Sequence, residues 1–193
     1  MKPKSLLKRL FRRFFGVVLT VVLVLFGADY GLGKLGQYLY PKTYGEFVEA
    51  YAAEYGVDTD FCYSMIKCES NFKPDAVSSA GAKGLMQMTP DTFAWVCGKL
   101  YGYEVDEELL FDPETNIKCG IWYLSYLQQE FAGEREVIAA YNAGPSHVKE
   151  WLSDSRYSHD GKTLSSLPFK ETENHIKKVQ NAKTIYKKLY EAR

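Results

Sequence analysis

Apolar residues recur at three- and four-residue spacing along most of this chain. This periodicity is typical of amphipathic helices that bury one face. Helices are predicted at 44–55, 59–70, 90–101, 112–131, 133–142, 145–154 and 170–191. The stripe in 112–131 is long enough for a buried central helix and consists of Ile117, Ile121, Leu124, Leu127 and Phe131. No comparable run alternates with period two, so any β-structure is small and is expected within 71–88.

Capping residues mark several of the predicted helix starts. Thr89 and Asp112 each stand directly before a proline, at the one helical position where the missing N–H of proline does no harm. Asp58 or Asp60 is the expected cap of the 59–70 helix. The chain is therefore predicted to be mainly α-helical.

The N-terminus differs from the rest of the chain in charge. Residues 1–13 hold six basic side chains and no acid, and the fifteen residues 14–28 carry no charge. At about 1.5 Å per residue that uncharged run spans roughly 22 Å, which is shorter than a bilayer core of roughly 30 Å. Length alone therefore does not distinguish a cleaved signal peptide from a membrane anchor. The absence of a clear small-x-small cleavage site favours a transmembrane signal-anchor at 14–28, with residues 1–13 in the cytoplasm.

Residues 29–43 contain three glycines and a proline, which predicts a short tether before a single domain at 44–193. The chain is formally neutral, with 24 basic and 24 acidic residues, but residues 29–193 carry 18 basic against 24 acidic side chains. A net charge of −6 on this part argues against nucleic acid as a partner.

Cysteines and histidines give no pattern typical of a metal site. The four cysteines fall at core-like helical positions, where free thiols behave as small hydrophobic groups, and we expect all four to be free. Cys97 and Cys119 are the first candidates if a pair forms. The three histidines are scattered and lack an HExxH pattern, so no metal and no cofactor are expected.

Glu69 is the candidate catalytic residue. If the helix begins at Asp58 or Asp60, an apolar stripe runs through Phe61 and Met65 and continues to Cys68 and Phe72, and Glu69 lies among these positions. A carboxyl group held against apolar neighbours loses solvation of its charged form, so it can carry a proton near neutral pH. Such a group is suited to general acid catalysis.

Three blocks of sequence together resemble a known family. The first comprises Glu69-Ser70, Phe72, Pro74, Ala76, Ser78 and Gly81-Ala82-x-Gly84-Leu85-Met86-Gln87; the second is Ala140-Tyr141-Asn142-Ala143-Gly144-Pro145; the third is Leu167-Pro168-Phe169-x-Glu171-Thr172. In this order they resemble the soluble-lytic-transglycosylase (SLT) domain of the lysozyme-like enzymes of glycoside hydrolase family 23. The resemblance implies a lysozyme-like, mainly α fold with a small β or loop element.

The resemblance also implies a reaction. Lytic transglycosylases cleave the β-1,4 bond between N-acetylmuramic acid and N-acetylglucosamine in peptidoglycan and leave a 1,6-anhydro end. The glutamate acts first as acid and later as base, the sugar's own 2-acetamido group assists, and no second carboxylate is needed. Peptidoglycan glycan strands are therefore an expected partner. The N-terminal segment adds the cytoplasmic membrane, with the catalytic domain expected on its outer (extracytoplasmic) side.

Further site residues are implied position by position. Ser78 resembles a residue that hydrogen-bonds within the site, and Met86 and Gln87 resemble the substrate-contacting end of the GLMQ turn. Tyr141 resembles the tyrosine whose hydroxyl orients the catalytic carboxyl, and Asn142 is implied to shape that region. In the third block Glu171 matches an acidic position that binds the peptide-bearing sugar or structures the cleft. His175 departs from the family, which usually has tyrosine there.

Two other functions fit the same features. A goose-type lysozyme would share the fold but use water as the nucleophile, and would have an added aspartate opposite Glu69. Asp75, Asp91 and Asp112 are the nearby carboxylates, but Asp91 and Asp112 stand at predicted helix starts and Asp75 at an unspecified position of the motif. A wall-binding scaffold without activity is the other alternative, and it would typically have lost the acid. A secreted form is the alternative localisation.

Overall fold

The structure is a computed structural model that describes residues 3–103 and 105–191. Within its first helix, the side chains of residues 3–13, 17, 22, 25, 26 and 28–30 are not described. The chain divides into two compact units, Met1–Pro41 and Lys42–Arg193.

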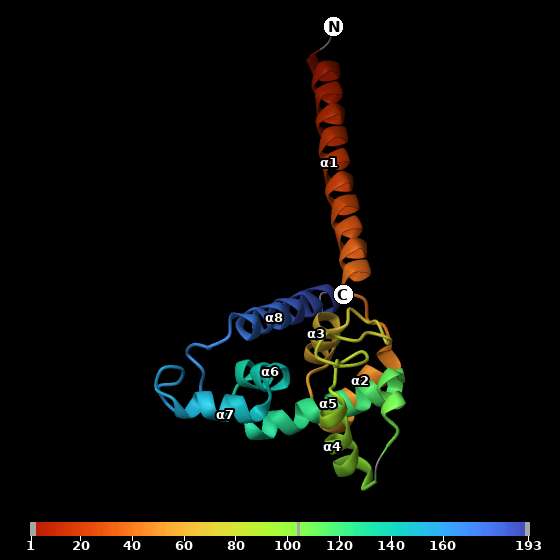
Figure 1. Cartoon of the computed structure of the whole chain (residues 1–193). Helices are drawn as coiled ribbons and strands as arrows, with labels where there is room; N and C mark the ends of the chain where they lie inside the picture. The colour runs from red at the N-terminus through yellow and green to blue at the C-terminus, as the bar shows by residue number, and fades with distance from the viewer. Residues whose placement is uncertain (1–2, 104, 192–193) are drawn as a thin grey trace. The chain divides into compact units, whose positions relative to one another are not determined.

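The first unit is the helix α1, Pro3–Leu39 (Figure 1). Its large apolar side chains are exposed where they are described, including Phe14 at 69%, Leu23 at 62% and Val24 at 64%. Among the described residues, no helix has both the length and the apolar character needed to cross a membrane. The side chains of the predicted basic segment 1–13 lie outside the described residues, as do five of those in the predicted anchor 14–28.

Residues 29–39, which belong to the predicted tether 29–43, are helical. Each glycine disfavours a helix by only about 1 kcal/mol, and the three in this segment do not interrupt it. The helix ends just before Pro41, whose ring disfavours the helical conformation for the preceding residue, Tyr40.

The second unit is helical and is organised around one central helix. Its elements are α2 Gly45–Tyr55, α3 Thr59–Glu69, α4 Pro90–Tyr101, η1 Glu107–Phe111, α5 Pro113–Glu130, α6 Glu134–Ala143, α7 Pro145–Ser153 and α8 Lys170–Glu191. The central helix α5 packs on α2, α4 and α6, and α8 packs on both α3 and α6 (Figure 1). All seven predicted helices are confirmed, with ends within about two residues.

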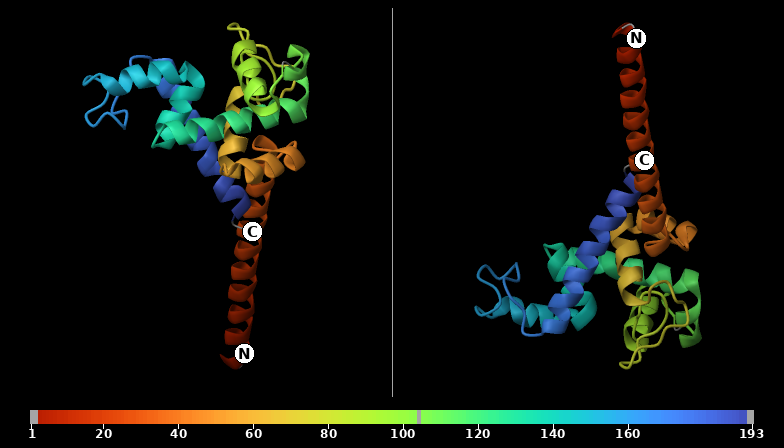
Figure 2. Two further views of the ribbon diagram at one scale, coloured as in Figure 1. Left: turned by 90° about the horizontal axis from the view of Figure 1, so that it is seen from below. Right: turned by 90° about the horizontal axis from the view of Figure 1, so that it is seen from above.

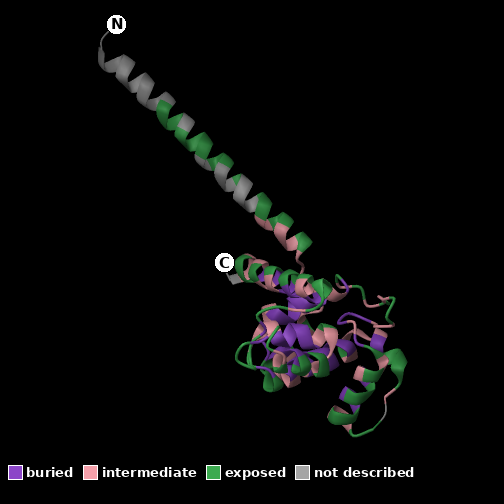
Figure 3. Ribbon diagram, turned by 60° about the vertical axis from the view of Figure 1, so that its left-hand side comes forward, coloured by how far each residue is buried: buried purple, intermediate pink, exposed green. Residues whose placement is uncertain are grey.

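The two ends of this unit carry different elements. In both views of Figure 2, α4 and the loop 71–89 gather at one end, whereas α7 and the segment 154–169 lie at the other. The buried residues form the interior between them (Figure 3), where Phe61, Leu124, Ile138 and Tyr186 are fully buried. Burying one such side chain contributes about 1.5–3 kcal/mol, so this core fixes α3, α5, α6 and α8 against one another.

Local signals in the sequence are confirmed at three helix starts. Asp58 accepts a hydrogen bond from Phe61 N, Thr89 from Thr92 N and Asp112 from Thr115 N. In the described part of the chain, β-structure is limited to isolated bridges, and both of them lie within the predicted segment 71–88. The bridged pairs are Val77 with Lys83 and Lys83 with Met88.

Candidate active site

Glu69 is the last residue of α3 and faces inward. The helix begins at the Asp58 cap, and Phe61 and Met65 are buried on its inner face. The side chain of Glu69, two turns after Phe61, is only 14% exposed. The helix does not continue to Phe72, as the predicted stripe implied, because Asn71 and Phe72 have φ values of 52° and 63°. The carboxyl group therefore lies where the helix stops and the loop 71–89 begins.

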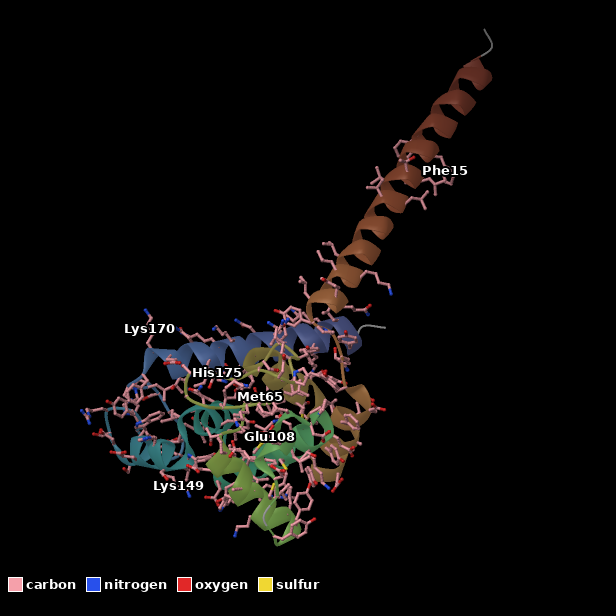
Figure 4. The ribbon with its side chains drawn as sticks, turned by 45° about the vertical axis from the view of Figure 1, so that its right-hand side comes forward. Phe15, Met65, Glu108, Lys149, Lys170 and His175 are labelled. Carbon is pink, nitrogen blue, oxygen red and sulfur yellow. The ribbon has the colours of Figure 1, made fainter. Side chains whose placement is uncertain are left out.

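His175, which is labelled on α8 in Figure 4, lies close to this carboxyl group. Its Nε2 is 3.2 Å from Glu69 Oε1, and its side chain is 12% exposed. The two atoms are close, but no hydrogen bond joins them, and the buried Nε2 has no hydrogen-bond partner among the described residues. The sequence marked His175 only as a departure from the family motif, and nothing in the sequence predicted its contact with Glu69.

The GLMQ turn is fixed to α5 through its backbone. Met86 N–H donates to Asn116 Oδ1 at 2.8 Å, and Asn116 Nδ2 donates to Leu110 O at 2.7 Å. Gly84 has a φ of +78°, and a Cβ on it would stand 2.1 Å from Leu110 O and 2.2 Å from Asn116 Nδ2. Only glycine therefore fits at this position. Asn116 was not predicted as a site residue, although a polar residue next to the apolar stripe of 112–131 was a usable signal.

Met86 was predicted to lie at the substrate-contacting end of the GLMQ turn. Its side chain is fully buried, and a Cβ on Gly120 of α5 would meet its Sδ at 2.3 Å. An enclosed side chain offers no surface to a glycan, so the substrate contact predicted for Met86 falls to its main chain and stays a prediction. Gln87 has a φ of 48° and donates from Nε2 to Ala76 O at 3.1 Å and to Gly84 O at 3.0 Å. Its amide nitrogen therefore braces the turn.

Two serines stabilise the loop 71–89. Ser70 follows Glu69, is buried, and donates from its hydroxyl to Leu85 O at 2.8 Å. Ser78 accepts from Ala82 N at 3.1 Å and so holds the hairpin-like turn before the GLMQ residues. Ser78 was predicted to hydrogen-bond within the site, whereas Ser70 was not given a role.

Tyr141 of α6 reaches the same turn from the other side. Its hydroxyl donates to Met86 O at 2.8 Å, whereas no hydrogen bond to Glu69 is found among the described residues. Burial first, and then the nearby charge of Glu69, raises the pKa of Tyr141 well above 10. The phenol therefore stays neutral beside the carboxyl group and positions the turn that borders it.

Asn142 and Glu171 lie along an open groove between the α6–α7 junction and the start of α8. One part of the groove, about 510 Å³, is lined by both residues together with His147, Pro168, Phe169, Lys170 and Thr172. The adjoining part, about 390 Å³, shares Asn142, Lys170 and Glu171 and extends along α8 to His175. The groove thus leads from Glu171 to His175, the residue that faces Glu69.

Two other carboxylates, Glu136 and Glu173, have structural roles beside the groove. Glu136 of α6 is 2% exposed and accepts from Leu164 N at 2.7 Å, and Glu173 of α8 pairs with Arg135. The Arg135 guanidinium lowers the pKa of Glu173. Arg135 also donates to Leu164 O at 3.0 Å, so these groups hold the segment 154–169 beside the groove. Asp112 is accounted for as the cap of α5.

Comparison with known proteins identifies the family. Residues 46–164 match the family model described as the Transglycosylase SLT domain, which covers more than half of the chain. The chain therefore belongs to the Transglycosylase SLT domain family.

Relatives of known name match over most of this chain but over only part of their own length. It is 36% identical over 155 residues to the soluble lytic murein transglycosylase of Escherichia coli K12, which covers 76% of this chain and 24% of that protein. It is 30% identical over 169 residues to the membrane-bound lytic murein transglycosylase C of Mannheimia succiniciproducens, which covers 76% of this chain and 47% of that protein.

Solved structures agree with this relationship. The 70 kDa soluble lytic transglycosylase of Escherichia coli superposes with a TM-score of 0.68 at 31% identity, over 80% of this chain and 26% of that one. An inactive glutamate-to-glutamine variant of lytic transglycosylase Slt from Pseudomonas aeruginosa gives a TM-score of 0.67, also at 31% identity, over 77% and 24%. The predicted mainly helical SLT fold is thus confirmed.

Proposed function

We propose that this chain is a peptidoglycan lytic transglycosylase that cleaves the bond between N-acetylmuramic acid and N-acetylglucosamine and leaves a 1,6-anhydro end. The observation that carries the proposal is the inward-facing Glu69 at the junction of α3 and the loop 71–89, beside the GLMQ turn. Membership of the SLT family and the lytic transglycosylase activity of the named relatives support it. An essential glutamate agrees with the inactive glutamate-to-glutamine variant of the Pseudomonas aeruginosa relative.

In this reaction Glu69 donates its proton to the glycosidic oxygen while the bond from that oxygen to C1 breaks. The 2-acetamido group of the same sugar assists at C1, and the C6 hydroxyl then forms the new bond to C1. The proton of that hydroxyl passes to the Glu69 carboxylate, which restores the starting state without consuming water. The groove lined by Asn142 and Glu171 would accommodate the neighbouring sugars or their stem peptides.

We further infer that α1 anchors the enzyme in the cytoplasmic membrane with the second unit outside. The support is the six basic residues of 1–13, the uncharged run 14–28 and the exposed apolar side chains of that run, such as Phe14 and Leu23. Contiguous exposed apolar surface of this kind is rare on soluble proteins. The membrane-bound relative agrees with this inference.

The test is mass spectrometry of muropeptides released from purified cell wall by the full-length protein. We expect anhydro ends, which are lighter by one water than the reducing ends that a goose-type hydrolase would produce. Glu69→Gln keeps the volume of the side chain but removes the transferable proton, so turnover should fall by at least roughly 10²–10⁴-fold with folding retained.

The matched control is Glu46→Gln, an exposed carboxylate in the first turn of α2, and it should leave turnover unchanged. Release of reducing ends would identify a hydrolase, and binding of wall without release would identify a scaffold. Near-normal release of anhydro products by Glu69→Gln would exclude Glu69 as the acid, and Glu171 would then be the next residue to replace.

A further inference from the structure

The contact between Glu69 and His175 joins two ionisable groups in a largely buried place. The atoms Oε1 and Nε2 are 3.2 Å apart, and the side chains are 14% and 12% exposed. The imidazole nitrogen is buried and has no hydrogen-bond partner among the described residues. A buried polar nitrogen left unpaired is unfavourable, so a proton placed between the two atoms would stabilise this arrangement.

Other ionisable groups surround the pair from three helices. From α3 comes the Cys68 thiol, from α6 the Tyr141 phenol, and from α8 the side chains of Lys170, Glu171 and Lys178. Burial raises the pKa of Cys68 to about 11 and that of Tyr141 well above 10, so both stay neutral at physiological pH. Lys170, Glu171 and Lys178 are exposed, so solvent and salt screen their interaction with the pair.

We propose that His175 is a positioning residue for the acid of the reaction, and that its imidazole shares a proton with the Glu69 carboxyl group. This proposal rests on the proposed function, since it assumes that Glu69 is the proton donor. Tyrosine, which the family usually has at this position, cannot take this role, because a phenol does not gain or lose charge near neutral pH. A histidine at this point is the substitution that would give the site a second titrating group.

A shared proton changes how activity depends on pH. At low pH both groups are protonated and Glu69 is ready to donate. At intermediate pH one proton is shared by the pair, so Glu69 carries it in only a fraction of the molecules. At high pH neither group carries a proton. The value of kcat/KM should therefore fall in two steps as pH rises, with a lower plateau between them.

A first experiment measures the pair directly and does not depend on activity. The three histidines, His147, His159 and His175, are titrated by NMR in the full-length protein and in Glu69→Gln. Because an opposite charge within 4–6 Å shifts a titration by about one to three units, the midpoint of His175 should fall by at least about one unit in Glu69→Gln. His147 and His159, which are exposed, serve as internal references and should not move.

A second experiment asks whether the pair controls the reaction. The kcat/KM profiles of His175→Gln and His175→Tyr should each show a single fall, at a pH between the two steps of the wild-type protein. A merely structural histidine would change kcat or thermal stability in these variants and leave the number of steps unchanged.

Three results would overturn the proposal: an unchanged midpoint of His175 in Glu69→Gln, an imidazole that stays neutral throughout the titration, or a wild-type profile with one step. A protein that releases no muropeptides would refute the proposed function instead, and the NMR titration would still decide whether the pair shares a proton.

Discussion

Tyr141 contributes to the site through a single hydroxyl group. The phenol is half-buried, and its hydrogen bond to the Met86 carbonyl connects α6 to the GLMQ turn. The main-chain N–H of Met86 donates a hydrogen bond to Asn116 of α5. The position of this turn relative to Glu69 is therefore set by two side chains that do not themselves transfer a proton.

Replacing Tyr141 with phenylalanine should weaken the turn but spare the acid. The buried Met86 carbonyl would lose its partner, which costs about 1–3 kcal/mol of stability. We expect a drop of that size in urea unfolding and a smaller loss of kcat than in Glu69→Gln. Tyr126→Phe, which removes a hydroxyl from the ring cluster of α5, is the control and should be near neutral. A loss of turnover as large as that of Glu69→Gln would show that the hydroxyl acts on the carboxyl group directly.

The cysteines are expected to stay reduced. All four are free thiols, and the Cys97 and Cys119 sulfurs are 3.9 Å apart, whereas a disulfide bond is about 2.05 Å long. Burial raises the pKa values of the Cys62 and Cys119 thiols, so little reactive thiolate forms. Thiol titration of the unfolded, non-reduced protein should find four groups. A count of two would point to a bond between Cys97 and Cys119.

Residues with local roles could be predicted from the sequence, and residues paired across the fold could not. The caps Asp58, Thr89 and Asp112 act within three residues of themselves, so their neighbours in sequence were sufficient. The partner of Glu69 lies more than a hundred residues away on another helix, and only the packing of α8 on α3 brings His175 to it. The burial of Met86 likewise follows from how the turn packs on α5.

At the scale of elements, the site depends on how closely the GLMQ turn approaches η1 and α5. Gly84 allows this approach because it has no side chain and adopts a positive φ. Gly84→Ala should reduce the free energy of unfolding by roughly 3–5 kcal/mol, since backbone strain and overpacking add together. Chemical denaturation measures this loss.

Gly56 offers a matched control for that change. It caps α2 with a similar φ of 69°, but nothing lies within 4 Å of the place where its Cβ would be. Gly56→Ala should therefore lower the free energy of unfolding only through the strain of the left-handed backbone conformation, by about 1–2 kcal/mol. Equal losses of unfolding free energy in Gly84→Ala and Gly56→Ala would mean that the GLMQ turn moves to accommodate the added methyl group.

The helices themselves followed from periodicity because each buries one face against a shared core. The exception is residues 29–39, where composition suggested a tether and the chain is helical. Glycine lowers helix propensity without forbidding the helix, so composition alone was a poor guide there. Proline gave the firmer signal, since the helix ends beside Pro41.

At the scale of the whole molecule, the chain combines an acidic second unit with a basic, apolar N-terminal helix. An anchor and a surface attachment by the basic residues of 1–13 differ in their response to salt. At 1 M salt, charges are screened beyond about 3 Å, whereas burial of apolar side chains in lipid is not weakened. We therefore expect the full-length protein, expressed in a bacterial host, to stay with membranes through a high-salt wash.

A charged variant separates the two kinds of attachment. Leu19→Lys combined with Leu23→Lys keeps the basic segment but places two charges in the middle of the uncharged run, where each is unfavourable by roughly 2.5–3.5 kcal/mol. This variant should be released by the wash, because only electrostatic attraction would then remain. Retention of the variant would mean that the basic segment or the second unit holds the protein at the membrane. A soluble wild-type form that begins near Lys34 would show that residues 14–28 are a cleaved signal.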